Sequence, residues 1–212
     1  MKQQFLKLPV CQSLITCGKA VVIAGIGILG LAALTSQPKV VRAIEAGNSQ
    51  VAAVSSWRAA SFPVENFLGY TSPFGYRQSP YGSGTRFHYG LDIAAPDGSY
   101  VRNWWAGQIV EVSDDSTCGT SVIVQSGSWT HIYCHMHGYV EFIGGQRYLV
   151  DRSGGIRLRE GQQIPSGARI GRVGLTGRTT GPHLHWGMKY SGSWVDPAVV
   201  LRAMYSQQTA RR

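Results

Sequence analysis

The sequence predicts a mostly β domain, built on an antiparallel sheet and followed by one short helix near the carboxyl end. The 212 residues include 27 glycines and 9 prolines, which favours many turns and short strands over long helices. Apolar residues gather in short segments of alternating or β-branched character, separated by Gly, Ser and Asp clusters. With 43% apolar and only 15% charged residues, the chain is neither a disordered polar tract nor a coiled coil.

Residues 1–43 have the order of an export signal. Lys2, Lys7 and Lys19 precede an uncharged apolar stretch over residues 20–34. This stretch is shorter than the roughly 20 residues that a spanning helix needs, so a signal cleaved after residues 41–43 is favoured. An uncleaved membrane anchor is the alternative, and a buried core helix is a weaker one. Either of the first two places the rest of the chain in the periplasm, the cell envelope or the extracellular space.

A polar linker is expected over residues 44–56, and the folded domain over residues 57–212. The expected strands of the domain are 108–112, 121–125, 130–135, 169–173, 183–188 and 193–195. The helix is expected to begin at Asp196, because Asp is a favoured N-cap and Pro197 suits the first helical position. An apolar run over residues 198–204 follows and would pack on the sheet.

The positive net charge gives only weak support for a nucleic-acid partner. Lys and Arg number 20 against 11 Asp and Glu, for a formal charge of +9. Five of the basic residues and one acid lie in residues 1–50, so +4 of the excess, nearly half, belongs to the amino-terminal segment. The remainder is scattered rather than gathered in a run. We therefore expect no nucleic-acid partner, and a basic surface that tolerates an anionic polymer.

The cysteines fit an oxidising compartment. Cys11 and Cys17 lie in the expected leader, which leaves Cys118 and Cys134 as the pair in the folded domain. A disulfide between them is expected. Metal binding is the competing interpretation, and it is weakened because neither cysteine belongs to a Cys-x-x-Cys pair.

All six histidines lie between His88 and His185, in three clusters. His183 and His185 are two apart on an expected strand, so both face one side about 7 Å apart. His88 and Asp92 would be about 13 Å apart on a straight strand, and Gly90 between them permits a bend. In the middle cluster, alternation predicts that residues 131, 133, 135 and 137 share one face and that Cys134 faces the other way.

Two neutral imidazoles and one carboxylate, with a fourth position open, form a catalytic zinc set. Oxygen-rich cages for calcium are absent from the sequence. Zinc lowers the pKa of a coordinated water to about 7 and polarises a scissile carbonyl. No His-Glu-x-x-His motif is present, and no Glu adjoins a histidine cluster. Histidines that do not bind the metal are therefore the candidate acid and base.

Four motifs, spread over about residues 62–197, resemble the lysostaphin-type zinc endopeptidases, which cut peptide bonds in bacterial cell walls. In chain order they are Ser-Pro-Phe-Gly-Tyr-Arg at 72–77, His-x-Gly-Leu-Asp at 88–92, Tyr-Cys-His-Met at 133–136, and Gly-Leu-Thr-Gly-Arg-Thr-Thr-Gly-Pro-His-Leu-His at 174–185. The resemblance implies an antiparallel β-domain, sandwich-like, with an open substrate groove across the sheet.

The resemblance also implies the site. His88, Asp92 and His185 would bind one zinc ion, and His135 and His183 would be catalytic. It implies a metalloendopeptidase acting on the stem or cross-bridge peptides of peptidoglycan. We expect a monomer that meets a membrane only through an uncleaved amino-terminal segment. The rival from another class is a noncatalytic peptidoglycan-binding module, or an activator of another wall hydrolase.

Several positions depart from the family pattern or have no family role. Met136 replaces the usual Leu, Cys134 replaces a small residue, and residues 103–105 are bulkier than is common, so the sequence leaves open which peptidoglycan bond is cut. Residues 144–155 are expected to form another wall of the groove. Structural roles are expected for the following side chains: His131, His137, Tyr133, Trp186, Thr179 and Thr180.

Overall fold

The computed structural model describes residues 57–210. The expected leader over residues 1–43 and the linker over 44–56 lie outside this part of the chain. Within the described residues, no helix combines the length and the hydropathy needed to cross a membrane.

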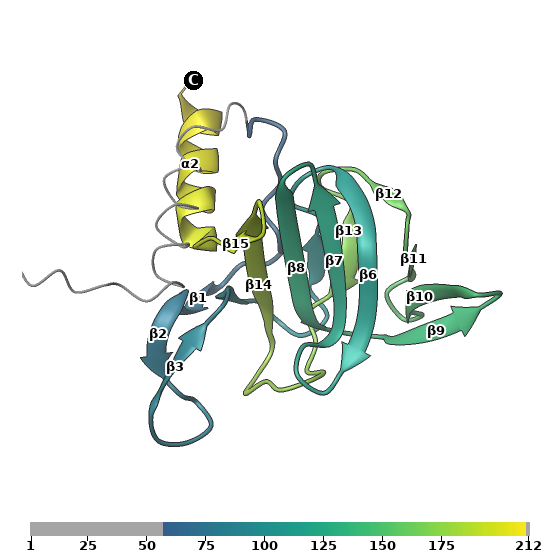
Figure 1. The fold of residues 1–212 in the computed structure, drawn as a ribbon, viewed down its shortest axis with the longest axis horizontal. Helices are drawn as coiled ribbons and strands as arrows, with labels where there is room; N and C mark the ends of the chain where they lie inside the picture. Colours follow the sequence, from purple (N-terminus) through teal and green to yellow (C-terminus); the bar gives the residue numbers. More distant parts are fainter. Residues whose placement is uncertain (1–56, 211–212) are drawn as a thin grey trace, which may run out of the picture. The chain divides into compact units, whose positions relative to one another are not determined.

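The described part is mostly antiparallel β-structure, which confirms the predicted fold class (Figure 1). The main sheet has the order β1-β4-β14-β8-β7-β6-β12, and β15 pairs with β14. Its strands are β1 (Gly69–Ser72), β4 (Leu91–Ala94), β6 (Gly107–Asp115), β7 (Gly119–Ser126), β8 (Trp129–Met136), β12 (Gln163–Ile164), β14 (His183–Tyr190) and β15 (Ser193–Trp194).

Three smaller sheets accompany it. They are the hairpin of β2 (Gly75–Gln78) and β3 (Thr85–His88), the pair of β5 (Tyr100–Arg102) and β13 (Arg169–Arg172), and the sheet of β9 (Tyr139–Ile143), β10 (Gln146–Asp151) and β11 (Ile156–Arg159). In Figure 1 the β2–β3 hairpin lies beside β1 and β14, whereas β9 and β10 project beyond β6 on the other side.

Each expected strand is present, although β13 and β15 end one residue early. The strands that were not expected are all two to six residues long. Such short segments show too little alternation to be recognised, and the partner strands that stabilise them are distant in sequence.

The two faces of the main sheet have different roles. Leu184 and Ile93 are direct partners on β14 and β4, and Trp186 and Tyr133 are partners on β14 and β8. All four side chains are fully buried, and the core continues into Trp57, Trp104 and Trp129, whose ring centroids lie 5.6–5.7 Å apart. Because neighbouring residues of a strand point to opposite faces, the polar residues between these apolar ones project away from the core.

The carboxyl-terminal helix α2 (Pro197–Thr209) confirms the prediction from its N-cap. The Asp196 carboxylate accepts a hydrogen bond from the backbone N–H of Ala198 at 2.9 Å. The helix buries Val200, Leu201 and Met204 in the core. Its last turn holds the start of the described chain, since the Gln208 amide donates to the carbonyl oxygen of Ala60 at 2.8 Å.

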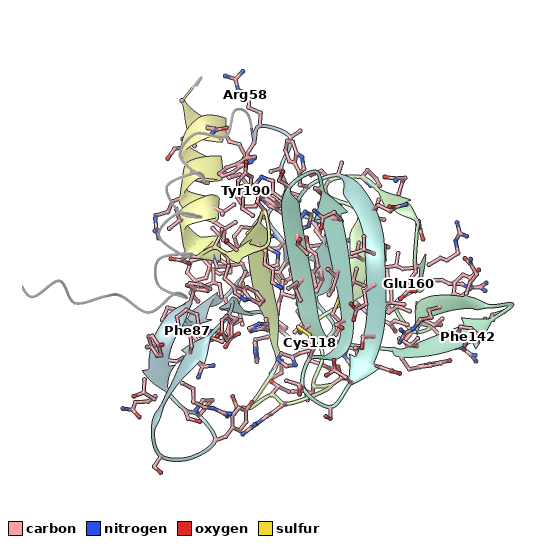
Figure 2. The ribbon with its side chains drawn as sticks, viewed as in Figure 1. Arg58, Phe87, Cys118, Phe142, Glu160 and Tyr190 are labelled. Atoms are coloured by element: carbon pink, nitrogen blue, oxygen red, sulfur yellow. A yellow bond between two sulfur atoms is a disulfide. The ribbon has the colours of Figure 1, made fainter. Side chains whose placement is uncertain are left out.

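A disulfide joins Cys118, just before β7, to Cys134 on β8, with Cα atoms 4.9 Å apart. This confirms the pairing expected from the sequence. Figure 2 shows the bond near the lower ends of β7 and β8. The bridge therefore anchors the turn that precedes β7 to the middle of the main sheet.

We expect that replacing both cysteines by Ser lowers the free energy of unfolding by about 3 kcal/mol, because closing a loop of this length restricts the unfolded chain by roughly that amount. Urea unfolding of both proteins, with and without reductant, measures the difference. Reductant should destabilise only the wild-type protein. Equal midpoints of the two oxidised proteins would contradict a stabilising role for the bridge.

Candidate active site

A row of polar side chains crosses four strands on the face of the sheet opposite the core. Ser72 on β1 pairs with Asp92 on β4, Asp92 pairs with His185 on β14, and His185 pairs with Cys134 on β8. Direct partners in antiparallel strands project from the same face. The sheet register itself therefore brings together residues up to 113 positions apart in sequence.

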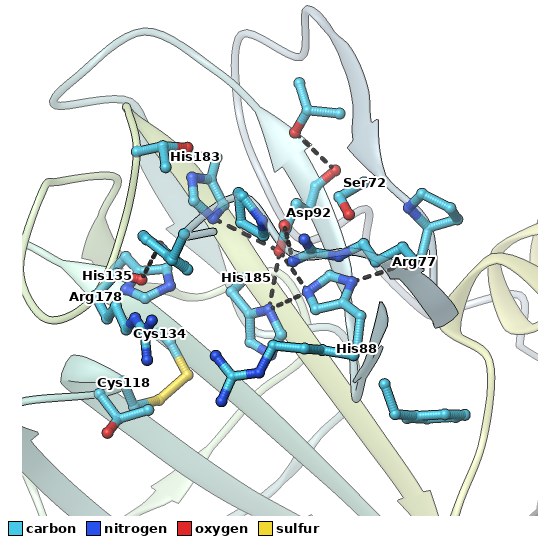
Figure 3. Close-up of a pocket in the computed structure, with 18 of the residues that line it drawn as sticks. Ser72, Arg77, His88, Asp92, Cys118, Cys134, His135, Arg178, His183 and His185 are labelled. Atoms are coloured by element: carbon cyan, nitrogen blue, oxygen red, sulfur yellow. Dashed lines mark hydrogen bonds and ion pairs between the residues drawn. A yellow bond between two sulfur atoms is a disulfide. The ribbon is translucent and has the colours of Figure 1, made fainter. Parts of the chain in front are cut away.

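His88, at the end of β3, completes a tight cluster with Asp92 and His185 (Figure 3). Oδ1 of Asp92 lies 3.0 Å from Nε2 of His88 and 2.8 Å from Nδ1 of His185. The two imidazole nitrogens are 3.0 Å apart. The bend at Gly90, between β3 and β4, thus brings together two residues that a straight strand would hold far apart.

The cluster has the composition and spacing of a metal site. Nδ1 of His88 lies 2.8 Å from the carbonyl oxygen of Pro73, which can only accept, so this nitrogen carries the ring hydrogen. The lone pair of Nε2 then faces the Asp92 carboxylate, and these two acceptors repel unless a cation lies between them. Tetrahedral zinc with bonds of about 2.0–2.1 Å separates its ligand atoms by about 3.3 Å. The three ligand atoms fit such an ion.

The protonation states also suit a metal. Burial raises the pKa of Asp92, but the close approach of the His185 and His88 imidazoles outweighs it and holds the pKa well below its usual range. Burial lowers the pKa of His185, and Asp92 opposes this in part. An ionised carboxylate and neutral imidazoles are the forms that bind metal ions.

Gly90 is needed for space as well as for the bend. A Cβ at this position would lie 2.6 Å from Cε1 of His185 and 2.8 Å from the carbonyl oxygen of Trp186. The backbone contact cannot be relieved by a change of side-chain rotamer. The His185 ring therefore packs directly against the backbone of residue 90.

We expect Gly90→Ala to displace the His185 ring and to lower metal affinity about 10–100-fold, as the loss of a supporting contact around a ligand does. Competition with a fluorescent zinc chelator measures the affinity. Gly192→Ala would disturb the fold locally, since Gly192 has φ +80°, but its Cβ meets no neighbour within 4 Å, so metal affinity should be kept. Unchanged affinity in Gly90→Ala would contradict the role of this contact.

His135 reaches the same face through a break in the strand pattern. It has φ 62°, and the pairing of β7 with β8 shifts register beside it, between Thr120 and Val122. Its N–H donates to the carbonyl oxygen of Cys118 at 2.8 Å. As a result Cys134 and His135 both line the cavity although they are adjacent. The expectation that residues 131, 133 and 135 share one face and Cys134 the other was wrong. His131 and Tyr133 face the core, and the β-bulge turns His135 to the side on which Cys134 lies.

His135 and His183 stand together beside the cluster, with ring centroids 5.0 Å apart. Nδ1 of His135 lies 2.9 Å from the carbonyl oxygen of Thr176, and Nδ1 of His183 lies 2.8 Å from that of Gly181. Both rings therefore carry the hydrogen on Nδ1 and present an unprotonated Nε2. Nε2 of His183 is 3.5 Å from Oδ1 of Asp92. Burial lowers the pKa of His135 to about 4.

The two remaining histidines lie outside the cavity. His131 is fully buried behind the sheet, where its nitrogens meet the Tyr133 hydroxyl at 3.1 Å and the Ser126 hydroxyl at 2.9 Å. His137 pairs with Asp97 at 2.8 Å. Tyr133 and Trp186 pack in the core. Thr179 serves the turn by donating to the carbonyl oxygen of Gly181, whereas Thr180 lines the cavity.

The cluster opens into a cavity of about 800 Å³. One wall is the β2–β3 hairpin, and another is the loop at residues 176–182. Tyr81, in the turn between β2 and β3, links the two walls because its hydroxyl donates to the carbonyl oxygen of Arg178 at 2.7 Å. Residues 144–155 do not line it, so their expected role as a groove wall was wrong. Arg86, Phe87 and Trp194 line the cavity, and no sequence motif pointed to them.

A mostly antiparallel sheet that carries two histidines and an aspartate at metal-binding distance, with two further histidines beside them, defines a metallopeptidase-like site. The description of peptidase family M23 matches residues 86–197, which is more than half of the chain and contains all six histidines. The chain belongs to peptidase family M23.

Two relatives and one solved structure illustrate the likeness. The chain is 33% identical over 131 residues to the DD-carboxypeptidase/endopeptidase Mpg of Neisseria meningitidis, covering 61% of this chain and 26% of that protein. It is 30% identical over 126 residues to the peptidoglycan DD-endopeptidase ShyA of Vibrio cholerae, covering 59% and 26%. A zinc-containing peptidase from Vibrio cholerae has a TM-score of 0.51 and 27% identity, covering 68% of this chain and 40% of that one. The chain thus spans about a quarter of the length of the curated relatives it matches.

Proposed function

We propose that this chain is an exported zinc metalloendopeptidase that hydrolyses peptide bonds in the stem or cross-bridge peptides of bacterial peptidoglycan. The observation that carries the proposal is the convergence of Asp92, His88 and His185, whose ligand atoms lie 2.8–3.0 Å apart, on the floor of an open cavity. The names of the two relatives, an endopeptidase and a peptidoglycan endopeptidase, support the substrate class. Export is supported by the lysines and the apolar stretch within residues 1–43.

His88, Asp92 and His185 would hold one zinc ion, and residues 57–212 would form the catalytic domain. When bound, zinc acidifies water and polarises the carbonyl of the scissile bond. The Pro73 carbonyl accepts the Nδ1 hydrogen of His88, which fixes the tautomer of this ring and directs its Nε2 at the metal position. Asp92 lies at the centre, in contact with both imidazoles.

His135 and His183 would handle the protons. Each presents an unprotonated Nε2 to the cavity while a backbone carbonyl holds its Nδ1 hydrogen. An Nε2 in this position accepts a proton from the attacking water and returns it to the amine that leaves when the tetrahedral intermediate collapses. The other imidazole stabilises the oxyanion of that intermediate only when it is protonated, because its Nε2 then carries a hydrogen to donate.

Digestion of purified, defined peptidoglycan tests this function. Mass spectrometry should find fragments with new amino termini, a chelator should abolish their release, and added zinc should restore it. His137→Ala is a matched control, because this histidine lies outside the cavity, and it should digest normally. If the pure protein released no new termini but stimulated another wall hydrolase, the noncatalytic alternative would replace the proposal.

A further inference from the structure

The cavity around the candidate metal site carries an excess of positive charge. Arg77 on β2, Arg86 on β3 and Arg178 on the loop after β13 all line it. Asp92 is the single acidic residue among the lining residues, and its Oδ1 already faces His88 and His185. Apart from Oδ2 of Asp92, the cavity lining therefore offers no carboxylate oxygen to the three arginines.

Arg77 and Arg86 form an unfavourable pair. They are direct partners in the register of the β2–β3 hairpin, so two like charges project from the same face. Like charges directly opposite each other destabilise a sheet. Arg77 approaches Oδ2 of Asp92 only to 3.8 Å, and Arg86 forms no ion pair within residues 57–210. An anion between the two guanidinium groups would relieve this repulsion.

Two buried donors at the same place also lack partners. Nε of Arg77 and Oγ of Ser72 are buried without a hydrogen-bond partner in the described part of the chain. Both residues line the cavity, and Figure 3 shows them on the same side of Asp92. Buried donors are normally satisfied, because leaving one unpaired costs about 1–3 kcal/mol. The oxygens of a ligand in the cavity would supply the acceptors that these groups lack.

Arg178 adds positive charge on the other side. Its guanidinium lies over the Tyr81 ring at 4.2 Å, and the Tyr81 hydroxyl holds its backbone carbonyl. Figure 3 shows Arg178 near His135 and Cys134, whereas Arg77 lies beyond Asp92. The field in the cavity is therefore positive on both sides of the histidines and attracts an anionic peptide.

We propose that Arg77 and Arg86, with Ser72, form a binding site for a free carboxylate of the substrate close to the scissile bond. The inference rests on the proposed function and narrows its substrate class. It selects peptides that carry a carboxylate beside the bond over uncharged bridges. The planar guanidinium binds a carboxylate through two parallel hydrogen bonds, which gives direction as well as charge.

Synthetic peptides test this proposal. Two pairs of peptides are compared, and the two members of a pair differ only in carrying a carboxylate or a carboxamide beside the scissile bond. In the first pair this group lies on the acyl side of the bond, and in the second pair it lies on the amine side. In one pair we expect kcat/KM to be about 10–100-fold higher for the carboxylate, as expected for a hydrogen bond to a charged group. The ratio should fall as salt is added.

Variants locate the effect. Arg86→Gln should bring the carboxylate to carboxamide ratio close to one, and Arg86→Lys should keep part of it, since Lys retains the charge without the paired geometry. Arg157→Gln, on β11 outside the cavity, removes the same charge and should keep the full ratio. Near-ultraviolet circular dichroism checks that each variant is folded.

Equal cleavage of both members of both pairs by an enzyme that digests peptidoglycan would overturn the carboxylate site and leave the proposed function intact. A full ratio in folded Arg86→Gln would also overturn it. Failure of the proposed function gives another result, with no chelator-sensitive cleavage of peptidoglycan or of any peptide.

Discussion

His88→Ala is expected to lose the bound zinc and to lower the release of new amino termini from peptidoglycan by about 10³-fold. The metal contributes several kcal/mol to stabilising the transition state, and each 1.36 kcal/mol is tenfold in rate. His88 supplies one of the three ligand atoms, and its Nε2 is already aimed at the metal position by the Pro73 carbonyl. Zinc per chain, measured by mass spectrometry of the metal, and the digestion rate should fall together.

The control for His88→Ala is His137→Ala, which removes the same side chain from a site outside the cavity. It should keep both zinc and activity. If His88→Ala retained one zinc per chain and digested peptidoglycan at the wild-type rate, His88 would not be a ligand and the assignment of the site would be wrong.

His135→Ala and His183→Ala are each expected to lower kcat by about 10²–10⁴-fold while zinc stays bound. This is the usual contribution of a positioned general acid or base. Neither ring belongs to the three-residue cluster, but both present Nε2 to the cavity beside it. Single-turnover cleavage of a peptide substrate, with zinc content measured on the same sample, separates this effect from metal loss.

The double variant distinguishes a shared task from independent ones. If His135 and His183 act on the same proton transfer, removing both should cost little more than removing one, because groups that act as a unit are not additive. A variant of either residue with wild-type kcat and full zinc would remove that residue from the mechanism.

The main strands and the last helix could be predicted because their signals are local. Alternation marks β7 and β8, and an Asp-Pro pair marks the start of α2. The cluster of His88, Asp92 and His185 could also be predicted, because the residue types match a zinc-binding set and the motifs that contain them occur in the order of a known family. Their meeting depends on the register of β4 with β14, which the sequence alone does not display.

Other features depend on contacts between distant segments. The positive φ of His135 is stabilised by hydrogen bonds to Cys118 and Gly174, so alternation along β8 placed Cys134 on the wrong face. The cavity wall depends on a contact between Tyr81 and Arg178, which are 97 positions apart. The β9–β10 hairpin carries no signal of which edge of the sheet it extends, and it lies away from the cavity.

Titration of metal-free protein with zinc tests the central claim most directly, that one ion held by His88, Asp92 and His185 makes this chain a peptidase. The rate at which new amino groups are released from purified peptidoglycan is measured after each addition. We predict no release without metal, a linear rise, and a break at one zinc per chain. Full digestion by the metal-free protein, or none at any zinc concentration, would contradict the claim.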